Sequence, residues 1–158
     1  MKFAPFAMFA ALALAGCQEK AATPKATNPD AKPGLSLTGG QLVLPAVRGN
    51  PGAAYFTLSN GGAETILAAV SVAGAEKAEM HETSGTAMTP IEKLPIKTGV
   101  TVKFAHGAKH LMVFGIDSRI IAGSKAEITL TFADGDKLSA PLEVVAAGEM
   151  AMDNGEMP

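Results

Sequence analysis

Short runs of strand-forming residues, separated by glycine and proline, fill the chain from about Leu35 to Val145. Apolar and polar side chains alternate within many of these runs, which places the apolar set on one face of a strand. No window keeps a helical period of apolar residues over three turns. The pattern therefore predicts these strands: Gln41–Val47, Ala53–Leu58, Thr65–Val72, Glu76–Thr83, Thr86–Ile91 (pairing back as a hairpin), Val100–Phe104, Lys109–Ile116, Glu127–Phe132 and Leu138–Val145.

Many short strands at regular spacing predict an all-β domain, either a sandwich or a barrel. The chain has no tryptophan and only one cysteine, which excludes the core of an antibody-type domain. An apolar share of 47% in 158 residues is enough for one hydrophobic core. The formal net charge of -2 gives no basic surface field, so nucleic acid is not expected as a partner.

Residues 1–16 are typical of a secretory signal peptide. A short basic start precedes Phe3–Ala15, an apolar run of thirteen residues that is too short to span a bilayer. The run ends in Leu-Ala-Gly-Cys at Cys17, which resembles a bacterial lipobox and predicts lipid modification of this cysteine. An ordinary signal peptide with a nearby cysteine is the alternative. Because Gln18 follows and no aspartate marks inner-membrane retention, we expect a periplasmic protein anchored to the outer membrane.

Two segments flank the expected domain at residues 35–147. Residues 17–34 are rich in alanine, threonine, lysine and proline, so we expect a flexible tether that begins with the lipidated cysteine. Residues 148–158 alternate methionine with acids and have no strand pattern, so we expect a disordered tail. Since Cys17 is the sole cysteine, the domain cannot contain a disulfide, and a metal site within it must do without thiolate.

Histidine and methionine are concentrated together. Methionine used as core filler would be scattered among the strands. Imidazole and thioether form a soft ligand set that suits Cu(I), whereas carboxylate and water suit Mg, Ca or Mn. The sequence therefore predicts a copper site, with surface histidines beside packed methionines as the alternative. All three histidines and half of the methionines after residue 16 lie in the stretch from Met80 to Met112. These residues are Met80, His81, Met88, His106, His110 and Met112.

Strand alternation assigns these side chains to faces. His110 and Met112 share one face of their strand, and Leu111 and Val113 point to the other. Two soft ligands at positions i and i+2 make half of a metal site. In the strand before it, His81 belongs to the polar face and is the better ligand.

Five further residues are weaker candidates for copper ligands. Met80 falls on the face opposite to His81 and is expected in the core. Met88 itself is expected in or just after a turn at Glu82–Ala87, free to move over the site. His106 is expected in an exposed loop. For the three methionines of the tail, the alternative is a tail that binds no metal. The additional candidates are Met80, His106, Met150, Met152 and Met157.

The spacing of these residues carries a family resemblance. Met80-His81, then Met88, twenty-one intervening residues and His110-Leu111-Met112 follow one another in this order. The chain thereby resembles the periplasmic copper(I) chaperones of the PCuAC type, whose signature is a histidine, a methionine, a gap of this length and His-x-Met. The resemblance runs from about Gln41 to Val145 and includes the segments Ala53–Asn60, Ala78–Thr83, Lys109–Met112 and Ile128–Phe132.

The resemblance implies a cupredoxin-like Greek-key β-sandwich that binds Cu(I) through His81, Met88, His110 and Met112. It also implies delivery of copper to an acceptor such as the copper site of cytochrome c oxidase, with a Sco-type thiol protein as a further partner. Blue-copper electron transfer needs a cysteine thiolate, which the domain lacks. We therefore expect a chaperone rather than an enzyme. The alternatives are a copper-sequestering tolerance lipoprotein and a structural lipoprotein without metal.

Two features depart from the family pattern. Six residues separate His81 from Met88, which is fewer than the family usually has. His106 stands in a loop where the family usually shows proline or glycine, so it either adds a ligand or is only an exposed loop residue.

Overall fold

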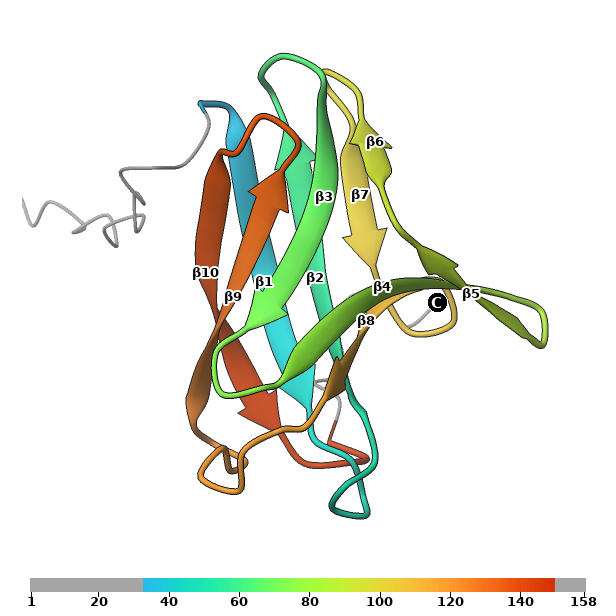
Figure 1. Cartoon of the computed structure of the whole chain (residues 1–158), viewed down its shortest axis with the longest axis vertical. Coiled ribbons are helices and arrows are strands. Elements are labelled where there is room, and N and C mark those ends of the chain that lie inside the picture. The colour runs from blue at the N-terminus through green and yellow to red at the C-terminus, as the bar shows by residue number, and fades with distance from the viewer. Residues whose placement is uncertain (1–32, 150–158) are drawn as a thin grey trace, which may run out of the picture.

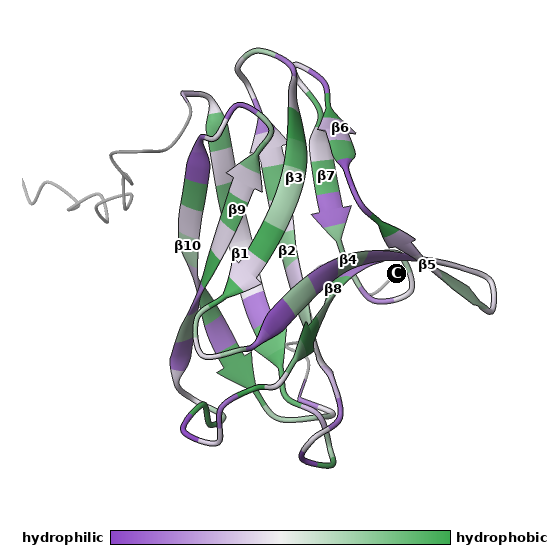
Figure 2. Ribbon diagram, in the orientation of Figure 1, coloured by the Kyte–Doolittle hydropathy of each residue, from purple (hydrophilic) through white to green (hydrophobic). Residues whose placement is uncertain are grey.

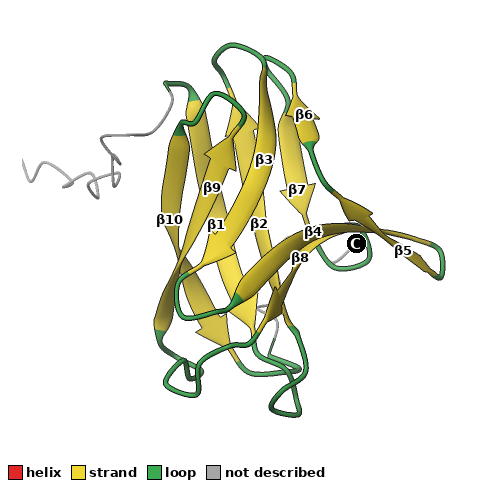
Figure 3. Cartoon of the chain, viewed as in Figure 1, coloured by secondary structure: helices red, strands yellow, loops and turns green. Residues whose placement is uncertain are grey.

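The computed structural model describes residues 33–149, and every regular element in this range is a strand (Figures 1 and 3). The all-β prediction is therefore confirmed. Within the described range, no helix has the length and apolar character needed to cross a membrane. The strands are β1 (Leu35–Val43), β2 (Gly52–Asn60), β3 (Thr65–Val72), β4 (Lys77–Ser84), β5 (Ala87–Ile91), β6 (Leu94–Ile96), β7 (Thr101–Phe104), β8 (Lys109–Phe114), β9 (Lys125–Phe132) and β10 (Lys137–Val145).

Several predictions concern residues outside the described range. They are the signal peptide at 1–16, the lipidated Cys17, most of the tether at 17–34, and the tail methionines Met150, Met152 and Met157. All of them stay predictions.

The strands form one hydrogen-bonded sheet in the order β5-β4-β8-β7-β2-β1-β10-β9-β3-β6. Neighbours run antiparallel, except that β1 pairs with β10 in parallel and β7 makes a short parallel contact with β8. The sheet folds over itself, so that β3 and β9 lie in front of β1 and β2 in Figure 1. Of the two architectures that the sequence left open, the protein adopts the sandwich.

Alternation of burial along the strands builds the core between the layers. Every second residue of β2 is buried from its first position to its last, and β9 buries every second residue as well. Figure 2 shows this alternation as hydrophobic and hydrophilic bands along the strands. Phe56 stacks on Phe104 with ring centroids 4.3 Å apart, which joins β2 to β7. Burial of each large apolar side chain stabilises the fold by about 1.5–3 kcal/mol, so the core can hold the domain without a disulfide.

The first strand differs from its prediction. The sequence predicted Gln41–Val47, but β1 runs from Leu35 to Val43 and contains two glycines. A shift of register in the pairing of β1 with β2 absorbs these glycines as a bulge, and Gly39 has a φ of 64° there. A Cβ on Gly40 would lie 2.8 Å from the carbonyl oxygen of Pro141, so β10 approaches β1 closely at this point. In the sequence these two glycines suggested that no strand runs through them, whereas in the structure the strand requires glycine at this point.

Strands β4, β5 and β8 form a corner that extends sideways from the body of the sandwich (Figure 1). The predicted hairpin is confirmed: β5 pairs with β4 from Ser84↔Ala87 to Met80↔Ile91, leaving a two-residue turn. The other side of β4 pairs with β8. β5 is one edge of the sheet, and it contains Pro90, which has no backbone N–H to donate.

The opposite edge, β6, was not predicted. It has three residues with a proline in the middle, which is too short for an alternation to be recognised. Its last residue, Ile96, is fully buried and pairs with Thr65 of β3. The structure therefore places an additional core residue there.

Candidate metal centre

Two histidines face each other across the pairing of β4 with β8. His81 lies directly opposite His110 in the antiparallel register, and the ring centroids are 6.2 Å apart with planes at 25°. Cross-strand partners project from the same face of a sheet. Imidazole nitrogens bind a metal such as zinc at about 2.0–2.1 Å, so rings at this spacing can share one ion after small side-chain rotations.

The hydrogen bonds of the two rings leave nitrogen atoms available to a metal. Nδ1 of His110 lies 3.0 Å from the carbonyl oxygen of Ala108. Because a carbonyl only accepts, this Nδ1 carries the proton and donates it, and Nε2 keeps its lone pair. A carbonyl that fixes the ring in this way is the usual outer contact of a metal-binding histidine. Nδ1 of His81 is buried and has no hydrogen-bond partner within residues 33–149.

The unpartnered nitrogen of His81 is the sharpest test of whether a metal fits. Leaving a buried polar atom without a partner costs about 1–3 kcal/mol. A metal ion that bound to this nitrogen would satisfy it. The residues present therefore fit a metal that accepts imidazole.

The two methionines lie on either side of the histidine pair. Met112 follows His110 by two residues and shares its face of β8. Met88 pairs with Thr83, which follows His81 by two residues on β4. The sequence placed Met88 in or just after a turn and within the hairpin strand Thr86–Ile91. The structure places it in β5, just after the two-residue turn, with 53% of its surface exposed. Hairpin pairing brings the methionine beside the histidines.

An open hollow of about 300 Å³, called the methionine hollow below, collects most of the predicted ligands. His81 is not among its lining residues and adjoins the hollow through its neighbour on β8. The structure thus brings two methionines and two histidines to the hollow, with the third histidine beside it. The lining residues are Pro51, Gly52, Ala53, Tyr55, Thr83, Met88, His106, Gly107, His110 and Met112.

The two described residues that the sequence treated as weaker candidates lie in different environments. Met80 is 4% exposed and belongs to the hydrophobic core, so its predicted burial is confirmed. His106 is exposed in the turn between β7 and β8, as predicted, but it lies at the methionine hollow. Of these two, only His106 is near the site.

The carboxylates close to the histidines are already paired with lysines. Glu79 lies 2.6 Å from Lys77, and this hydrogen bond lowers the pKa of Glu79 below its ordinary value. Glu82 lies 2.5 Å from Lys109. In the part of the chain that the structure describes, no three side chains of the types His, Cys, Asp and Glu gather into a metal site. The available donors are therefore imidazole and thioether, which is a soft set.

Tyr55, the only tyrosine of the chain, was missed by the sequence reasoning. It lines the methionine hollow from β2, and burial raises the pKa of its hydroxyl. Tyr55 could have been assigned to the site only from the pairing of β2 with β8, in which Ala53 lies opposite Met112. That pairing connects segments far apart in the sequence, and the pattern of one strand does not contain it.

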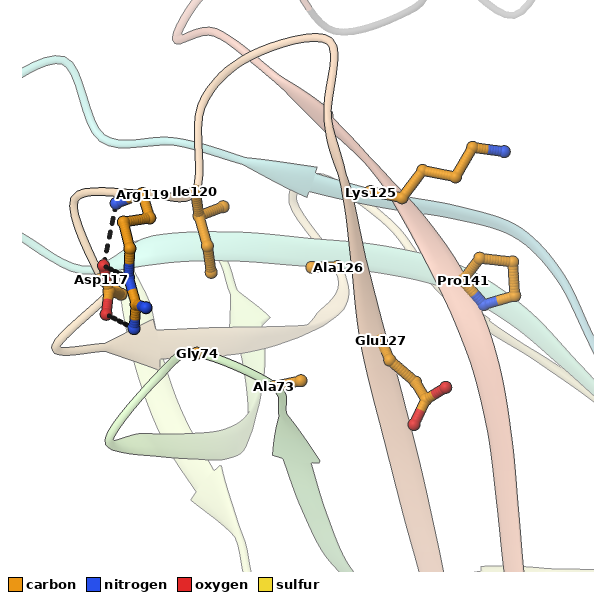
Figure 4. A pocket seen from close by; sticks show the side chains of 9 residues that line it. All are labelled: Ala73, Gly74, Asp117, Arg119, Ile120, Lys125, Ala126, Glu127 and Pro141. Carbon is orange, nitrogen blue, oxygen red and sulfur yellow. Dashed lines mark hydrogen bonds and ion pairs between the residues drawn. The ribbon is translucent and has the colours of Figure 1, made fainter.

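A larger hollow of about 550 Å³, called the charged hollow below, lies elsewhere on the sandwich (Figure 4). Arg119 contacts Asp117 at 2.7 Å and lowers the pKa of this carboxyl to about 2. Lys125 contacts Glu143 at 2.9 Å. The side chains that line this hollow include no histidine and no methionine. The larger of these two hollows therefore offers no soft metal donors.

Comparisons with known proteins agree with this architecture. A family model described as "Putative lipoprotein LpqE-like" matches residues 35–144. The "Putative lipoprotein Lxx21020" of Leifsonia xyli subsp. xyli is 28% identical over 128 residues, which cover 64% of this chain and 77% of that protein.

Solved structures give a second comparison. The copper-bound PCuAC domain from PmoF2 matches with a TM-score of 0.62 at 18% identity, covering 72% of this chain and 93% of that chain. The solution structure of CuI-DR1885 from Deinococcus radiodurans matches with a TM-score of 0.56 at 24% identity, covering 75% and 83%. These likenesses confirm the cupredoxin-like sandwich that the PCuAC resemblance implied.

Proposed function

The chain belongs to the LpqE-like lipoprotein family, and from this premise we propose that it is a Cu(I) carrier outside the cytoplasm. The observation that supports this most is the His81–His110 pair, in which one ring has a fixed tautomer and the other a buried nitrogen without a partner. Two thioethers flank this pair. Two structural neighbours, the copper-bound PCuAC domain from PmoF2 and CuI-DR1885, support the choice of metal.

The proposed ligands are His81, Met88, His110 and Met112. All four are uncharged donors, so bound Cu(I) keeps its single positive charge. Thioether selects Cu(I), and imidazole also suits copper. Unlike a pair of thiols, this set cannot be lost to a disulfide in an oxidising compartment. Methionine oxidation to the sulfoxide remains its chemical weakness.

Delivery rather than storage is favoured by the openness of the site. Met88 is more than half exposed on an edge strand, so an incoming ligand from an acceptor can replace it first. The acceptor we propose is a copper enzyme such as cytochrome c oxidase, with a Sco-type thiol protein as a further partner. We propose no catalytic activity, because the carboxylates Glu79 and Glu82 beside the histidines are held by lysines.

A test of the function combines binding with transfer. The full chain, titrated with Cu(I) against a chromophoric Cu(I) chelator, is expected to take up one equivalent tightly and to show no intense blue absorption. The loaded chain is then mixed with the apo copper domain of cytochrome c oxidase. Movement of copper to that domain supports delivery, and tight retention of copper favours sequestration instead. Failure to withhold Cu(I) from the chelator would remove the copper assignment.

The lipid anchor is a separate part of the proposal. The lipobox at Cys17 and the descriptions of the family and of its relative as lipoproteins support it. Cys17→Ser is expected to move the protein from the membrane fraction to the soluble fraction without changing Cu(I) affinity. Density-gradient separation of the two membranes tests the expected outer-membrane location. Wild-type protein without lipid would contradict the anchor.

A further inference from the structure

A third hollow, called the end groove below, lies between two loops at one end of the sandwich. Residues 44–51 connect β1 to β2, and residues 115–124 connect β8 to β9. Both loops lie at the lower end of the molecule in Figure 1, where β10 also ends. The groove has a volume of about 300 Å³. It adjoins the methionine hollow, because Asn50 lines the groove and the next residue, Pro51, lines the hollow.

The floor of the end groove is apolar. Leu44, Ile116 and Ile120 line it, and these half-buried side chains pack against the hydrophobic core. Ile121 also lines the groove and is 58% exposed, and Val47, which lies between two lining residues, is 63% exposed. Covering apolar surface of this kind stabilises the covered state by about 25 cal/mol per Å². The groove therefore favours an apolar occupant.

One cation without a partner lies at the end groove. Arg48 lines the groove and is exposed. In the described part of the chain, no carboxylate forms an ion pair with Arg48, and Asp117, which also lines the groove, is held by Arg119. A guanidinium binds a carboxylate through two parallel hydrogen bonds. The groove thus fits a segment that combines apolar side chains with carboxylates.

The end of β10 is hydrogen-bonded to both loops that form the groove. The N–H of Leu44, in the first loop, donates to the carbonyl of Val145 at 2.9 Å. The N–H of Gly123, in the second loop, donates to the carbonyl of Val144 at 2.8 Å. The chain therefore leaves β10 between the two walls of the groove.

The nine residues after Glu149 have the composition that the groove favours. Residues 150–158 contain three methionines and two acids, with no lysine or arginine. Methionine is unbranched and adapts to irregular apolar surfaces. The N–H of Glu149 donates to the carbonyl of Ala146 at 3.1 Å, so the chain turns just after β10. Nine extended residues reach about 30 Å, which is enough to cross the groove from this turn.

We propose that residues 150–158 bind in the end groove of the same chain. The methionines cover the apolar floor, and a carboxylate pairs with Arg48. Because the segment is tethered beside the groove, its effective concentration there is high, and weak contacts are enough to hold it. A single exposed ion pair contributes little, so the apolar contacts supply most of the free energy. The inference involves no metal and does not rest on the proposed function.

The test uses the full chain with ¹³C in the methionine methyl groups, in buffer that contains a metal chelator. The tail signals are assigned with Met150→Leu, Met152→Leu and Met157→Leu. Binding in the groove is read from nuclear Overhauser cross-peaks between a tail methyl and the methyl groups of Ile120 and Ile121. These cross-peaks require that the two methyl groups lie in contact.

Two groove variants and a matched control define the expected result. Ile121→Ser removes an exposed apolar side chain, and Arg48→Glu reverses the charge at the groove. Lys103→Glu makes the same change of charge at an exposed residue of β7 that does not line the groove. Wild type and Lys103→Glu are expected to show the cross-peaks to Ile120. Both groove variants are expected to lose them, with the tail signals moving to the position of free methionine.

The signal of Met80 controls for folding in the same spectrum. This side chain is buried in the core, so its signal is expected at one position in all variants.

Two results would overturn the proposal. Tail signals that stand at the position of free methionine in the wild type, unchanged by Arg48→Glu, would show that the tail does not bind the groove. Cross-peaks that vanish on dilution would assign the groove to the tail of a second copy, because contact within one chain does not depend on concentration. Either result leaves the Cu(I) proposal intact, since the measurement contains no copper.

Discussion

The charged hollow and the methionine hollow differ in size and in chemistry. The charged hollow, at about 550 Å³, is the larger, and its cations Arg119 and Lys125 are already neutralised by neighbouring carboxylates. The methionine hollow, at about 300 Å³, offers thioethers and imidazoles that have few partners or none. Donor atoms that lack a partner can gain one by binding, whereas a paired charge must first lose one. Uncommitted donors, rather than volume, therefore identify the candidate site.

The largest expected effect comes from the histidine pair. His81→Ala and His110→Ala each remove a ligand, so Cu(I) affinity is expected to fall by about 100-fold or more. Arg119→Ala in the charged hollow is the matched control and is expected to leave the affinity unchanged. Competition with a chromophoric Cu(I) chelator measures all three variants. If Arg119→Ala lowered the Cu(I) affinity as much as the histidine substitutions do, the methionine hollow would not be the specific copper site.

The thioethers are expected to contribute less than the imidazoles. Met112→Leu and Met88→Leu keep a similar apolar volume, so the fold should survive while Cu(I) affinity falls by about tenfold. X-ray absorption of the copper-loaded protein should show one sulfur fewer in each variant. Unchanged affinity and unchanged sulfur number in Met88→Leu would mean that the exposed methionine on β5 does not reach the metal.

A buried methionine separates packing from ligation. Met80 is next to His81 in sequence but lies in the core, 4% exposed. Met80→Leu conserves volume, so it should cost less than about 1.5 kcal/mol of unfolding free energy and leave Cu(I) affinity unchanged. Urea unfolding measures the first quantity and chelator competition the second. If Met80→Leu lowered Cu(I) affinity as much as Met112→Leu does, the proposed ligand set would contain the wrong methionine.

The smallest expected effect concerns the charged hollow. Arg119 holds the pKa of Asp117 at about 2, below its ordinary value of 3.8, so the folded state binds this proton less readily than the unfolded state. The stability from this pair is therefore complete above the ordinary pKa and is lost as the pH falls toward about 2. Because the pair is exposed, the effect is small.

Asp117→Asn tests this contribution. Urea unfolding of the variant should show a slightly weaker loss of stability between pH values of about 4 and about 2 than the wild type shows. Its Cu(I) affinity at neutral pH should equal that of the wild type. A steeper acid dependence in the variant than in the wild type would contradict the assignment of the proton to Asp117.

Alternation within one strand was enough to predict the faces of β8. Leu111 and Val113 are fully buried, and His110 with Met112 lies on the other face, as the period of two required. The same pattern failed at Gly39 and Gly40, because a bulge lets a glycine pair continue a strand that the sequence appears to end. Local rules thus predict faces better than they predict where a strand begins.

The order of the strands in the sheet decides which side chains come together at the site. A local sequence pattern does not contain this order. His81 meets His110 because β4 pairs with β8, and Tyr55 joins them because β2 pairs with β8 on the other side. The spacing of the motif indicated which residues belong together, and the predicted hairpin strand Thr86–Ile91 contained Met88. Neither pattern contained the approach of Tyr55, which follows from the long-range pairing of β2 with β8.

The proline on the edge strand has a consequence for how this protein meets others. A free strand edge offers unpaired N–H and C=O groups to any passing chain, and the result is polymerisation or aggregation. β5 is five residues long, and its Pro90, directly across from His81, leaves one donor missing from the row. A second copy that tried to extend the sheet here would lose a hydrogen bond beside the histidines. Self-association by strand addition is thereby disfavoured at the edge next to the site. The site remains accessible to transient contacts that other proteins make through their side chains.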